Sequence, residues 1–582
     1  MFSLCSHKGS RLAIRFFHYP TLNTLILCRH EIRRKNMKTG EAIAQILKAE
    51  GIEYLFGYPV NSIFEYVAKA GIQPIIVRQE RIGLHMADAF SRLSSGKTIG
   101  AFAMQHGPGT ENSFGGIAQA YSESVPILVL PGGYDRRLEN VDPNFSAVKN
   151  FAHVSKSVEQ LSSGKEIGNV FRRAFTQLRN GRGGPCIVEL PKDVWAENAP
   201  EGFSYKPAIT TKYGPDAASV KAAAALLKDA KKLVIYAGQG VHYAEAWPQL
   251  KELAELLAAP VCTSLEGKSA FPENHGLSLG SGGAAMPRMV RDWLDNADVI
   301  FGVGCSFGET AFGVQMPNGK TIVHATLDPK HLNKDVEAAV GLIGDAALTL
   351  DALLDLLRKD VKKPRDRTAV EKEIAAAREA WMKDWTAKLT SDETPITPYR
   401  VIHEMMNTFD VANTIITHDA GSPRDQLSPF WKSITPLSYI GWGKTTHLGY
   451  GLGLAMGAKL ARPDKLCVNV WGDAAIGFTG MDFETAARYK IPILSILFNN
   501  FSMACELPIM EYSTEHYRST DISGHYADFA KALGGYGERI ENPDDIVPAL
   551  KRGIQKTQEG TPVLLEFITG KELKQSRWPY KG

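Results

Sequence analysis

The stretch that decides the fold reads Leu466-Cys-Val-Asn-Val-Trp-Gly-Asp-Ala474 and, a little further on, Ile491-Pro-Ile-Leu-Ser-Ile-Leu-Phe-Asn-Asn500. Each part begins with an apolar, β-branched run that is typical of a buried parallel strand. The segment between them, from Met481 to Tyr489, has helical spacing, so the whole predicts a β-α-β unit. Both strands end in polar residues, and open α/β sheets bind ligands in the crevice outside those ends.

The polar residues at these strand ends have the chemistry of a magnesium diphosphate site. Asp473 offers a carboxylate and Asn500 a carbonyl oxygen, and Mg²⁺ takes few protein oxygens and completes its shell with phosphate and water. Small residues beside them would let backbone N–H groups at a helix N-terminus approach a diphosphate; these are Gly472, Ala474 and Ala475. Taken alone, the same residues also fit an ordinary strand-end turn followed by a polar loop.

The 582 residues are too many for one hydrophobic core, so several domains are expected. Strands and helices alternate on both sides of a linker rich in Pro, Lys and Thr at 200–215, which predicts an α/β protein with three Rossmann-like doubly wound parallel-sheet domains. The expected parts are an extension at 1–36, a first domain at 37–200, a central domain at 216–360, a charged helical linker at 361–394 and a third domain at 395–572. Residues 573–582 are expected to be a loose polar tail.

Residues 1–36 differ from the rest of the chain because they hold seven Lys and Arg residues against one acid, Glu31. Two interpretations remain open. One is an Arg-rich organelle presequence; the other, slightly favoured, is an upstream stretch preceding a true start at Met37. Without this segment the net charge of +3 becomes slightly negative, which gives no reason to expect nucleic acid or an anionic membrane as a partner.

The cysteines and the hydropathy pattern bear on the compartment. The seven cysteines are scattered without paired spacing, and Cys186, Cys262 and Cys467 lie in strand-like runs as small core residues. No apolar run reaches the ~18–20 residues needed to span a bilayer. A reducing, cytoplasmic location is therefore expected, with organelle targeting by 1–36 as the alternative.

Further motifs carry a resemblance to a known family. They are Arg78-Gln-Glu-Arg-Ile-Gly-Leu-His-Met-Ala87, Gly107-Pro-Gly-Thr-Glu-Asn112, Gly441-Trp-Gly-Lys-Thr-Thr-His-Leu-Gly449, and the Gly-Asp-Ala and Asn-Asn pair described above. Together they resemble the thiamin diphosphate-dependent enzymes of the acetohydroxyacid synthase, pyruvate oxidase and 2-oxoacid decarboxylase superfamily, over essentially all of 37–572. The resemblance implies pyrimidine-binding, central and diphosphate-binding domains in that order.

The resemblance also implies residue roles. Glu80 would protonate N1′ of the aminopyrimidine, which suits a carboxyl group beside an apolar pocket. Asp473, Asn500 and the Ser502 carbonyl would hold Mg²⁺, and Leu448 would support the bent cofactor while the Thr446 carbonyl and the Leu448 N–H face the pyrimidine. Ser422 and Arg424 would reach the diphosphate, since arginine suits such groups. The other expected cofactor contacts are Pro59, Gly109, Asn112, Gly421 and Met503, besides Gly472, Ala474 and Ala475.

Several positions depart from the synthases of this superfamily. Gln79-Glu80-Arg81 stands where they carry His-Glu-Gln, and Gln105-His106 replaces a Thr-Ser pair, so Gln105 and His106 are candidate catalytic residues facing the substrate. The expected reaction is cleavage or formation of a C–C bond on a 2-oxoacid or related ketone. Acyl transfer, flavin-linked oxidation or diketone cleavage are alternatives with the same cofactor, and a non-catalytic cofactor-binding homologue is an alternative of another class. Donor and acceptor are not predicted.

The central domain and the assembly are the last expectations. Gly238-Gln-Gly240 follows the strand at 233–237, but a lone Gly-x-Gly is usually only a tight turn, so FAD is possible and undecided. In the superfamily the pyrimidine domain of one chain meets the diphosphate domain of another. The resemblance therefore implies a homodimer or homotetramer with Glu80 and Asp473 acting across the interface, and a small-molecule substrate.

Overall fold

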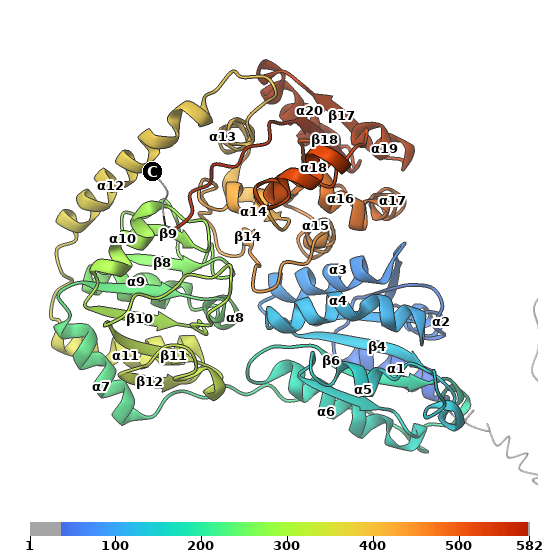
Figure 1. Cartoon of the computed structure of the whole chain (residues 1–582). Helices are drawn as coiled ribbons and strands as arrows, with labels where there is room; N and C mark the ends of the chain where they lie inside the picture. The colour runs from blue at the N-terminus through green and yellow to red at the C-terminus, as the bar shows by residue number, and fades with distance from the viewer. Residues whose placement is uncertain (1–36, 580–582) are drawn as a thin grey trace, which may run out of the picture. The chain divides into compact units, whose positions relative to one another are not determined.

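The structure is a computed structural model that describes residues 37–579. The expected segment at 1–36 lies outside the described residues. Within them the chain forms three six-stranded sheets, and every strand pair in each sheet is parallel. Figure 1 shows helices on both faces of these sheets, so the predicted α/β architecture of three doubly wound domains is confirmed.

The first sheet has the strand order β2-β1-β3-β4-β6-β5. Its strands are β1 (Tyr54–Gly57), β2 (Gln73–Ile76), β3 (Gly100–Met104), β4 (Ile127–Gly133), β5 (Ser157–Gln160) and β6 (Cys186–Pro191). Its helices are α1 (Thr39–Ala49), α2 (Ile63–Lys69), α3 (Glu80–Leu93), α4 (Pro108–Ser122), α5 (Ala147–Phe151) and α6 (Ile167–Arg179). The strands β3 and β4 are buried throughout, apart from Gly132, as their continuous apolar runs require.

The central sheet has a different order, β12-β11-β10-β7-β8-β9. Its strands are β7 (Leu233–Ala237), β8 (Val261–Ser264), β9 (Ser278–Gly282), β10 (Val299–Val303), β11 (Thr321–Thr326) and β12 (Val340–Ile343). Its helices are α7 (Ala217–Asp229), α8 (Gly240–Ala244), α9 (Trp247–Leu257), α10 (Arg288–Asn296) and α11 (Ala346–Asp360). Counted from its own first strand this is the 3-2-1-4-5-6 order of dinucleotide-binding sheets.

The third sheet, β14-β13-β15-β16-β18-β17, repeats the strand order of the first. Its strands are β13 (Thr414–His418), β14 (Tyr439–Ile440), β15 (Leu466–Gly472), β16 (Leu494–Asn499), β17 (Tyr536–Ile540) and β18 (Val563–Ile568). Its helices are α13 (Pro398–Thr408), α14 (Ser422–Leu427), α15 (Tyr450–Ala461), α16 (Asp473–Thr479), α17 (Phe483–Arg488), α18 (Glu511–Tyr517), α19 (Tyr526–Ala532) and α20 (Ile546–Gln558). The helix expected at 481–489 is α17, and a further helix, α16, precedes it and begins directly at Asp473.

The matching strand orders give two helices the same place in their domains. The helix α3 follows the strand β2, and α15 follows the corresponding strand β14. These two helices pack on each other, and the glycines of α15 allow the close approach. A Cβ atom at Gly453 would lie 2.5 Å from the Cβ of His85, and one at Gly457 would lie 2.3 Å from the backbone oxygen of Met86.

Two expectations about the linker and the tail are wrong. The helix expected from Lys362 is α12 (Thr368–Leu389), which starts beyond Pro364, and it is not a purely solvated connector. One stripe of it is buried in the hydrophobic core, made of Ile374, Trp381, Trp385 and Leu389.

The tail is docked over residues 573–579. The Ser576 hydroxyl donates to the Met286 carbonyl at 2.7 Å and accepts from the Trp381 indole at 3.2 Å, and the Trp578 ring lies 4.0 Å from the Arg291 guanidinium. No helix of the described chain is long and apolar enough to cross a membrane.

Candidate active site

The first part of the candidate site lies where β15 and β16 end side by side. Gly472 of β15 is in register with Phe498 of β16, so Asp473 and Asn500 follow at the same edge of the sheet. The Asp473 carboxylate accepts hydrogen bonds from the backbone N–H groups of Ala474, Asn500 and Ser502 at 2.9, 3.1 and 3.2 Å. The three expected metal residues, Asp473, Asn500 and Ser502, are therefore brought together.

The two asparagines at the end of β16 have different environments. Asn499 is fully buried and its amide donates to Glu566 at 2.7 Å, which makes it a structural residue. Asn500 is partly exposed, and its side-chain oxygen accepts from the Ser502 N–H at 3.0 Å. Between them Phe501 adopts φ 56°, a left-handed conformation that turns the chain so that Ser502 comes back to Asp473.

The charge at Asp473 is uncompensated within the described chain. Its carboxyl group is 4% exposed, and none of the ion pairs of the described residues includes it. Burial raises the pKa of Asp473 to about 6, although its backbone N–H partners oppose the shift. One carboxylate, one amide oxygen and one backbone carbonyl form a hard-oxygen donor set that fits Mg²⁺ with a diphosphate. The described residues hold no cluster of three or more His, Cys, Asp or Glu suited to another metal.

The neighbouring strand end contributes Gly421 and Ser422. The connections from β13 and β15 leave in opposite directions, so this is the switch point of the sheet, where doubly wound folds bind ligands. Gly421 has φ 78°, a conformation that favours glycine, and it precedes α14. The Ser422 hydroxyl lies 2.9 Å from the thiol sulfur of Cys505, next to the Asn500–Ser502 turn.

Arg424 lies in the same helix but its contacts favour a structural role. Its guanidinium is 2% exposed and pairs with the adjacent Asp425 at 2.7 Å. The same guanidinium lies 4.3 Å from the Phe312 ring of the central domain. The carboxylate next to it in the sequence therefore holds the side chain, and the geometry gives no support to the expected contact of Arg424 with the diphosphate.

The loop at 441–449 is tied down by hydrogen bonds at nearly every residue. The backbone N–H groups of Gly443 and Lys444 donate to Glu123, and that of Gly449 donates to Asp419. Among the backbone groups that make no hydrogen bond within the described chain are the Thr446 carbonyl and the Leu448 N–H. These are the two groups expected to face the aminopyrimidine, so a cofactor would find one acceptor and one donor free in a loop that side chains hold at Gly443, Lys444 and His447.

Glu80 begins α3 and is 5% exposed. The Asn112 amide approaches its carboxylate at 3.4 Å. A Cβ at Gly109 would lie only 3.1 Å from the same carboxylate, so that position must stay small. Burial raises the pKa of Glu80, which favours the protonated form of this carboxyl group more than in an exposed glutamate.

The remaining candidates follow β1, β3 and β16. Pro59 is exposed after β1, and Met503 is 39% exposed after the Asn500 turn. Gln105 and His106 follow β3, which corresponds to β15, so they occupy in the first domain the place of Asp473 in the third. The His106 ring packs edge-on against the Tyr134 ring, with centroids 4.7 Å apart. Burial, followed by the nearby charge of Lys192, lowers the pKa of His106.

Comparison with known proteins places these features in a family. The models for the N-terminal, central and C-terminal domains of thiamine pyrophosphate enzymes match residues 37–160, 220–353 and 419–567. The chain is 31% identical to a "Probable acetolactate synthase large subunit" of Methanocaldococcus jannaschii, over 91% of this chain and 92% of that one. It is 30% identical to the acetolactate synthase isozyme 3 large subunit of Escherichia coli, over 91% and 95%.

The chain belongs to the thiamine pyrophosphate enzymes. Thiamine pyrophosphate and thiamin diphosphate are two names for the same cofactor. The family predicted from the sequence is therefore confirmed. In this thiamine pyrophosphate enzyme Asp419 is a residue whose role the sequence did not predict. It is fully buried, and its carboxylate accepts from the N–H groups of Gly449 and Gly451 at 2.9 and 3.0 Å. The only sequence signal was an acid at a strand end before Ala-Gly.

The central domain of this thiamine pyrophosphate enzyme borders a cavity of about 640 Å³ at the carboxyl ends of β7, β10 and β11. The glycines of Gly238-Gln-Gly240 are explained by packing, because a Cβ at Gly240 would lie 2.7 Å from Gly304. The interpretation of this motif as a tight turn is thus supported. Lys97, Arg182 and Lys334 are among the basic residues that line the cavity.

Proposed function

We propose that this chain holds thiamin diphosphate and Mg²⁺ and cleaves or forms a C–C bond next to the carbonyl of a 2-oxoacid or related ketone. The observation that carries the proposal is the loop at 441–449, which is held by side chains through several N–H groups while the Thr446 carbonyl and the Leu448 N–H make no hydrogen bond within the described chain. A buried, unpaired Asp473 at the switch point of the same domain supports it.

Each end of the cofactor has its own residues. Asp473, Asn500 and the Ser502 carbonyl would hold Mg²⁺, with Gly421, Ser422, Gly472, Ala474 and Ala475 beside the diphosphate. Glu80 would hold a proton at N1′ of the aminopyrimidine, where burial keeps its carboxyl group ready to exchange one. Bound there, the cofactor supplies a nucleophilic carbon and an electron sink for the substrate carbonyl.

The overall change balances without a further redox partner. The bond between the carboxyl carbon and the carbonyl carbon of the 2-oxoacid breaks and CO₂ leaves. The electron pair then goes either to a proton, which gives an aldehyde, or to an acceptor carbonyl, which gives a 2-hydroxyketone. Because Gln105 and His106 lie at the carboxyl end of β3, they are the residues we assign to the substrate side.

The assembly and the central cavity complete the proposal. We infer a homo-oligomer in which Glu80 of one chain and Asp473 of another serve one cofactor, as the family resemblance implies. The change written above passes no electrons to a flavin, so it assigns no step to the central cavity. The spectrum of the purified protein decides whether it holds FAD, since a bound flavin absorbs visible light.

The test is a screen of 2-oxoacids, pyruvate among them, for CO₂ release and for the identity of the second product. We expect release that requires both thiamin diphosphate and Mg²⁺. An aldehyde assigns a decarboxylase and a 2-hydroxyketone assigns a carboligase of the acetolactate synthase type. Tight cofactor binding with no turnover on any 2-oxoacid would overturn the proposed reaction.

A further inference from the structure

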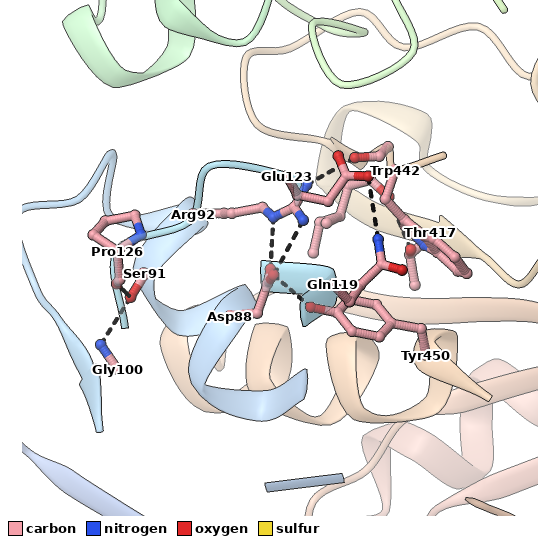
Figure 2. Close-up of polar contacts among 12 residues, drawn as sticks. Asp88, Ser91, Arg92, Gly100, Gln119, Glu123, Pro126, Thr417, Trp442 and Tyr450 are labelled. Carbon is pink, nitrogen blue, oxygen red and sulfur yellow. Dashed lines mark hydrogen bonds and ion pairs between the residues drawn. The ribbon is translucent and has the colours of Figure 1, made fainter. Parts of the chain in front are cut away.

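A buried polar network joins α4 of the first domain to the loop at 441–448 of the third. Figure 2 shows Gln119 of α4 and Glu123, which directly follows α4, facing this loop, with Asp88, Arg92 and Tyr450 beside them. We propose that Gln119 and Glu123 are positioning residues that fix the backbone of this loop, so that the Thr446 carbonyl and the Leu448 N–H are presented to the aminopyrimidine. The inference rests on the proposed function of the site.

Glu123 holds the first half of the loop. Its side chain is fully buried, and one of its oxygens, Oε1, accepts from the N–H of Gly443 at 3.1 Å and from that of Lys444 at 2.9 Å. The other oxygen, Oε2, has no hydrogen-bond partner within the described chain. Burying a carboxyl group with one unpaired oxygen lowers the stability of the folded state. The hydrogen bonds that Glu123 accepts from two backbone N–H groups of the loop offset part of this cost and give the residue a role.

Gln119 holds the second half, one helical turn earlier in α4. Its side-chain oxygen accepts from the Thr445 hydroxyl at 2.7 Å and from the His447 N–H at 3.4 Å. Its amide nitrogen donates to Oε1 of Glu123 at 3.2 Å, which fixes the orientation of the amide. The two residues therefore bracket Thr446 and reach the residue directly before Leu448.

The base of the loop is fixed by a second set of contacts. Arg92 donates to both oxygens of Asp88, at 2.6 and 3.1 Å, and to the Gly441 carbonyl at 2.8 Å. The Tyr450 hydroxyl donates to Asp88 at 2.6 Å, just beyond the other end of the loop. The ends of the loop are thus held independently, and Gln119 and Glu123 are left to set the position of its middle.

The position of the middle matters because the two free groups have no other support. A shift of the Gly443–His447 backbone would move the Thr446 carbonyl and the Leu448 N–H relative to the pyrimidine ring. Misplacement of a reacting group by ~1 Å can cost ~10²-fold in rate. Loss of the contacts that Gln119 and Glu123 make with the loop should therefore slow proton exchange at C2 of the bound cofactor. It should weaken binding of the diphosphate only slightly.

The experiment compares four variants of the full chain, each measured in two ways. Gln119→Ala and Glu123→Ala each remove one side chain that holds the loop at 441–448. Glu123→Gln keeps the accepting oxygen and places its amide nitrogen at the unpaired position, so it should rescue. Ser122→Ala is the matched control, because this neighbouring hydroxyl contacts the Thr445 side chain at 3.2 Å and the Gln119 carbonyl at 2.8 Å, and no backbone group of the loop.

The first measurement is amide hydrogen exchange of the 441–448 peptide without cofactor, and the second is exchange of the cofactor C2 proton at saturating cofactor. We expect the two alanine variants to lose amide protection in this peptide and to exchange the C2 proton about 10²-fold more slowly. Glu123→Gln and Ser122→Ala should stay within a few-fold of the parent.

The outcomes separate the inference from the proposed function. If the parent binds no thiamin diphosphate and shows no C2 exchange, the proposed function fails. If the parent exchanges normally and both alanine variants match it, the inference is overturned while the function stands. If an alanine variant does not fold, Gln119→Glu replaces it. A carboxylate at this position repels the carboxylate of Glu123 and cannot donate the hydrogen bond that the Gln119 amide gives to Glu123. Parent-like C2 exchange in that folded variant would also overturn the inference.

Discussion

Oδ2 of Asp473 accepts a hydrogen bond from the backbone N–H of Ser502 at 3.2 Å, across 29 residues of sequence. The contact exists because β15 and β16 are parallel neighbours and the left-handed Phe501 folds the chain back after β16. It aligns the carboxylate with the Asn500 side chain and the Ser502 backbone before any metal arrives. A site prepared in this way would need little rearrangement to bind the divalent cation that we propose.

The first prediction concerns this carboxylate. Asp473→Ala should abolish retention of thiamin diphosphate, because Mg²⁺ loses its only protein carboxylate and the diphosphate loses its bridge to the protein. Cofactor bound per chain after gel filtration measures the effect, with excess Mg²⁺ present. Asp482→Asn is the matched control, since Asp482 also accepts a backbone N–H, from Arg78, but follows the other end of α16. An Asp473→Ala protein that retains cofactor like the parent would refute the metal assignment.

The second prediction tests whether one site is built from two chains. Glu80→Gln and Asp473→Ala proteins should each lose nearly all activity alone, with about 1% or less remaining in Glu80→Gln. When the two are unfolded together and refolded, or co-expressed with different tags, the mixed dimer has one site with both changes and one with neither. If Glu80 and Asp473 of different chains share a cofactor, the mixed dimer recovers about half of the parent activity. Sites built within one chain would give no recovery.

Much of the architecture could be predicted from the sequence because buried parallel strands are continuous apolar runs. Such runs were evident for β3, β4, β15 and β16. The edge strands β5 and β12 were not predicted, because they are mostly half-buried and lack that signal. The packing of the tail was also missed, since it depends on Trp381 and Met286, which are remote in sequence.

Some residues of the candidate site could likewise be predicted from the sequence, and the roles of others are visible only in the structure. Asp473 and Asn500 could be predicted because each directly follows a strand, and strand ends of a parallel sheet meet. Arg424 was assigned to the diphosphate by residue type alone, and only the structure shows its pairing with Asp425. Gln119 and Glu123 lie at the end of a helix, where an amide and an acid four residues apart normally indicate a solvent-exposed pair.

The third prediction concerns pH and the contact between α3 and the third domain. Asp482 accepts from the Arg78 N–H at 2.7 Å and from the Thr485 hydroxyl at 2.9 Å, while its second oxygen has no partner within the described chain. Burial raises the pKa of Asp482 to about 6 from an ordinary value of 3.8; the hydrogen bonds to this carboxyl group oppose the shift, and the nearby charge of Glu484 adds to it. A raised pKa means that the folded state favours the protonated form.

The stabilisation from that proton is therefore complete below about pH 4 and is lost as the pH rises through about 6. Asp482→Asn keeps the accepting oxygen and never ionises. Its free energy of unfolding relative to the parent should rise by on the order of 3 kcal/mol between pH 4 and pH 8. Denaturant unfolding of both proteins at several pH values measures this. A difference that stays constant with pH would contradict the assigned ionisation of Asp482.

The last prediction concerns the proton at Glu80. Glu80→Gln preserves the size of the side chain and can still form a hydrogen bond, but it cannot hand over a proton. Cofactor binding should weaken only modestly, while exchange of the cofactor C2 proton slows by about 10²–10⁴-fold, the usual contribution of a positioned general acid. Exchange into deuterated water, followed by quenching and NMR, measures this step without knowledge of the substrate. Asn112→Ala is a useful companion, because Asn112 is the side chain that approaches the Glu80 carboxylate, at 3.4 Å. It should slow the same exchange less, since the carboxyl group remains. If Glu80→Gln exchanges as fast as the parent, Glu80 only begins α3, and the catalytic role of the first domain must lie with other residues.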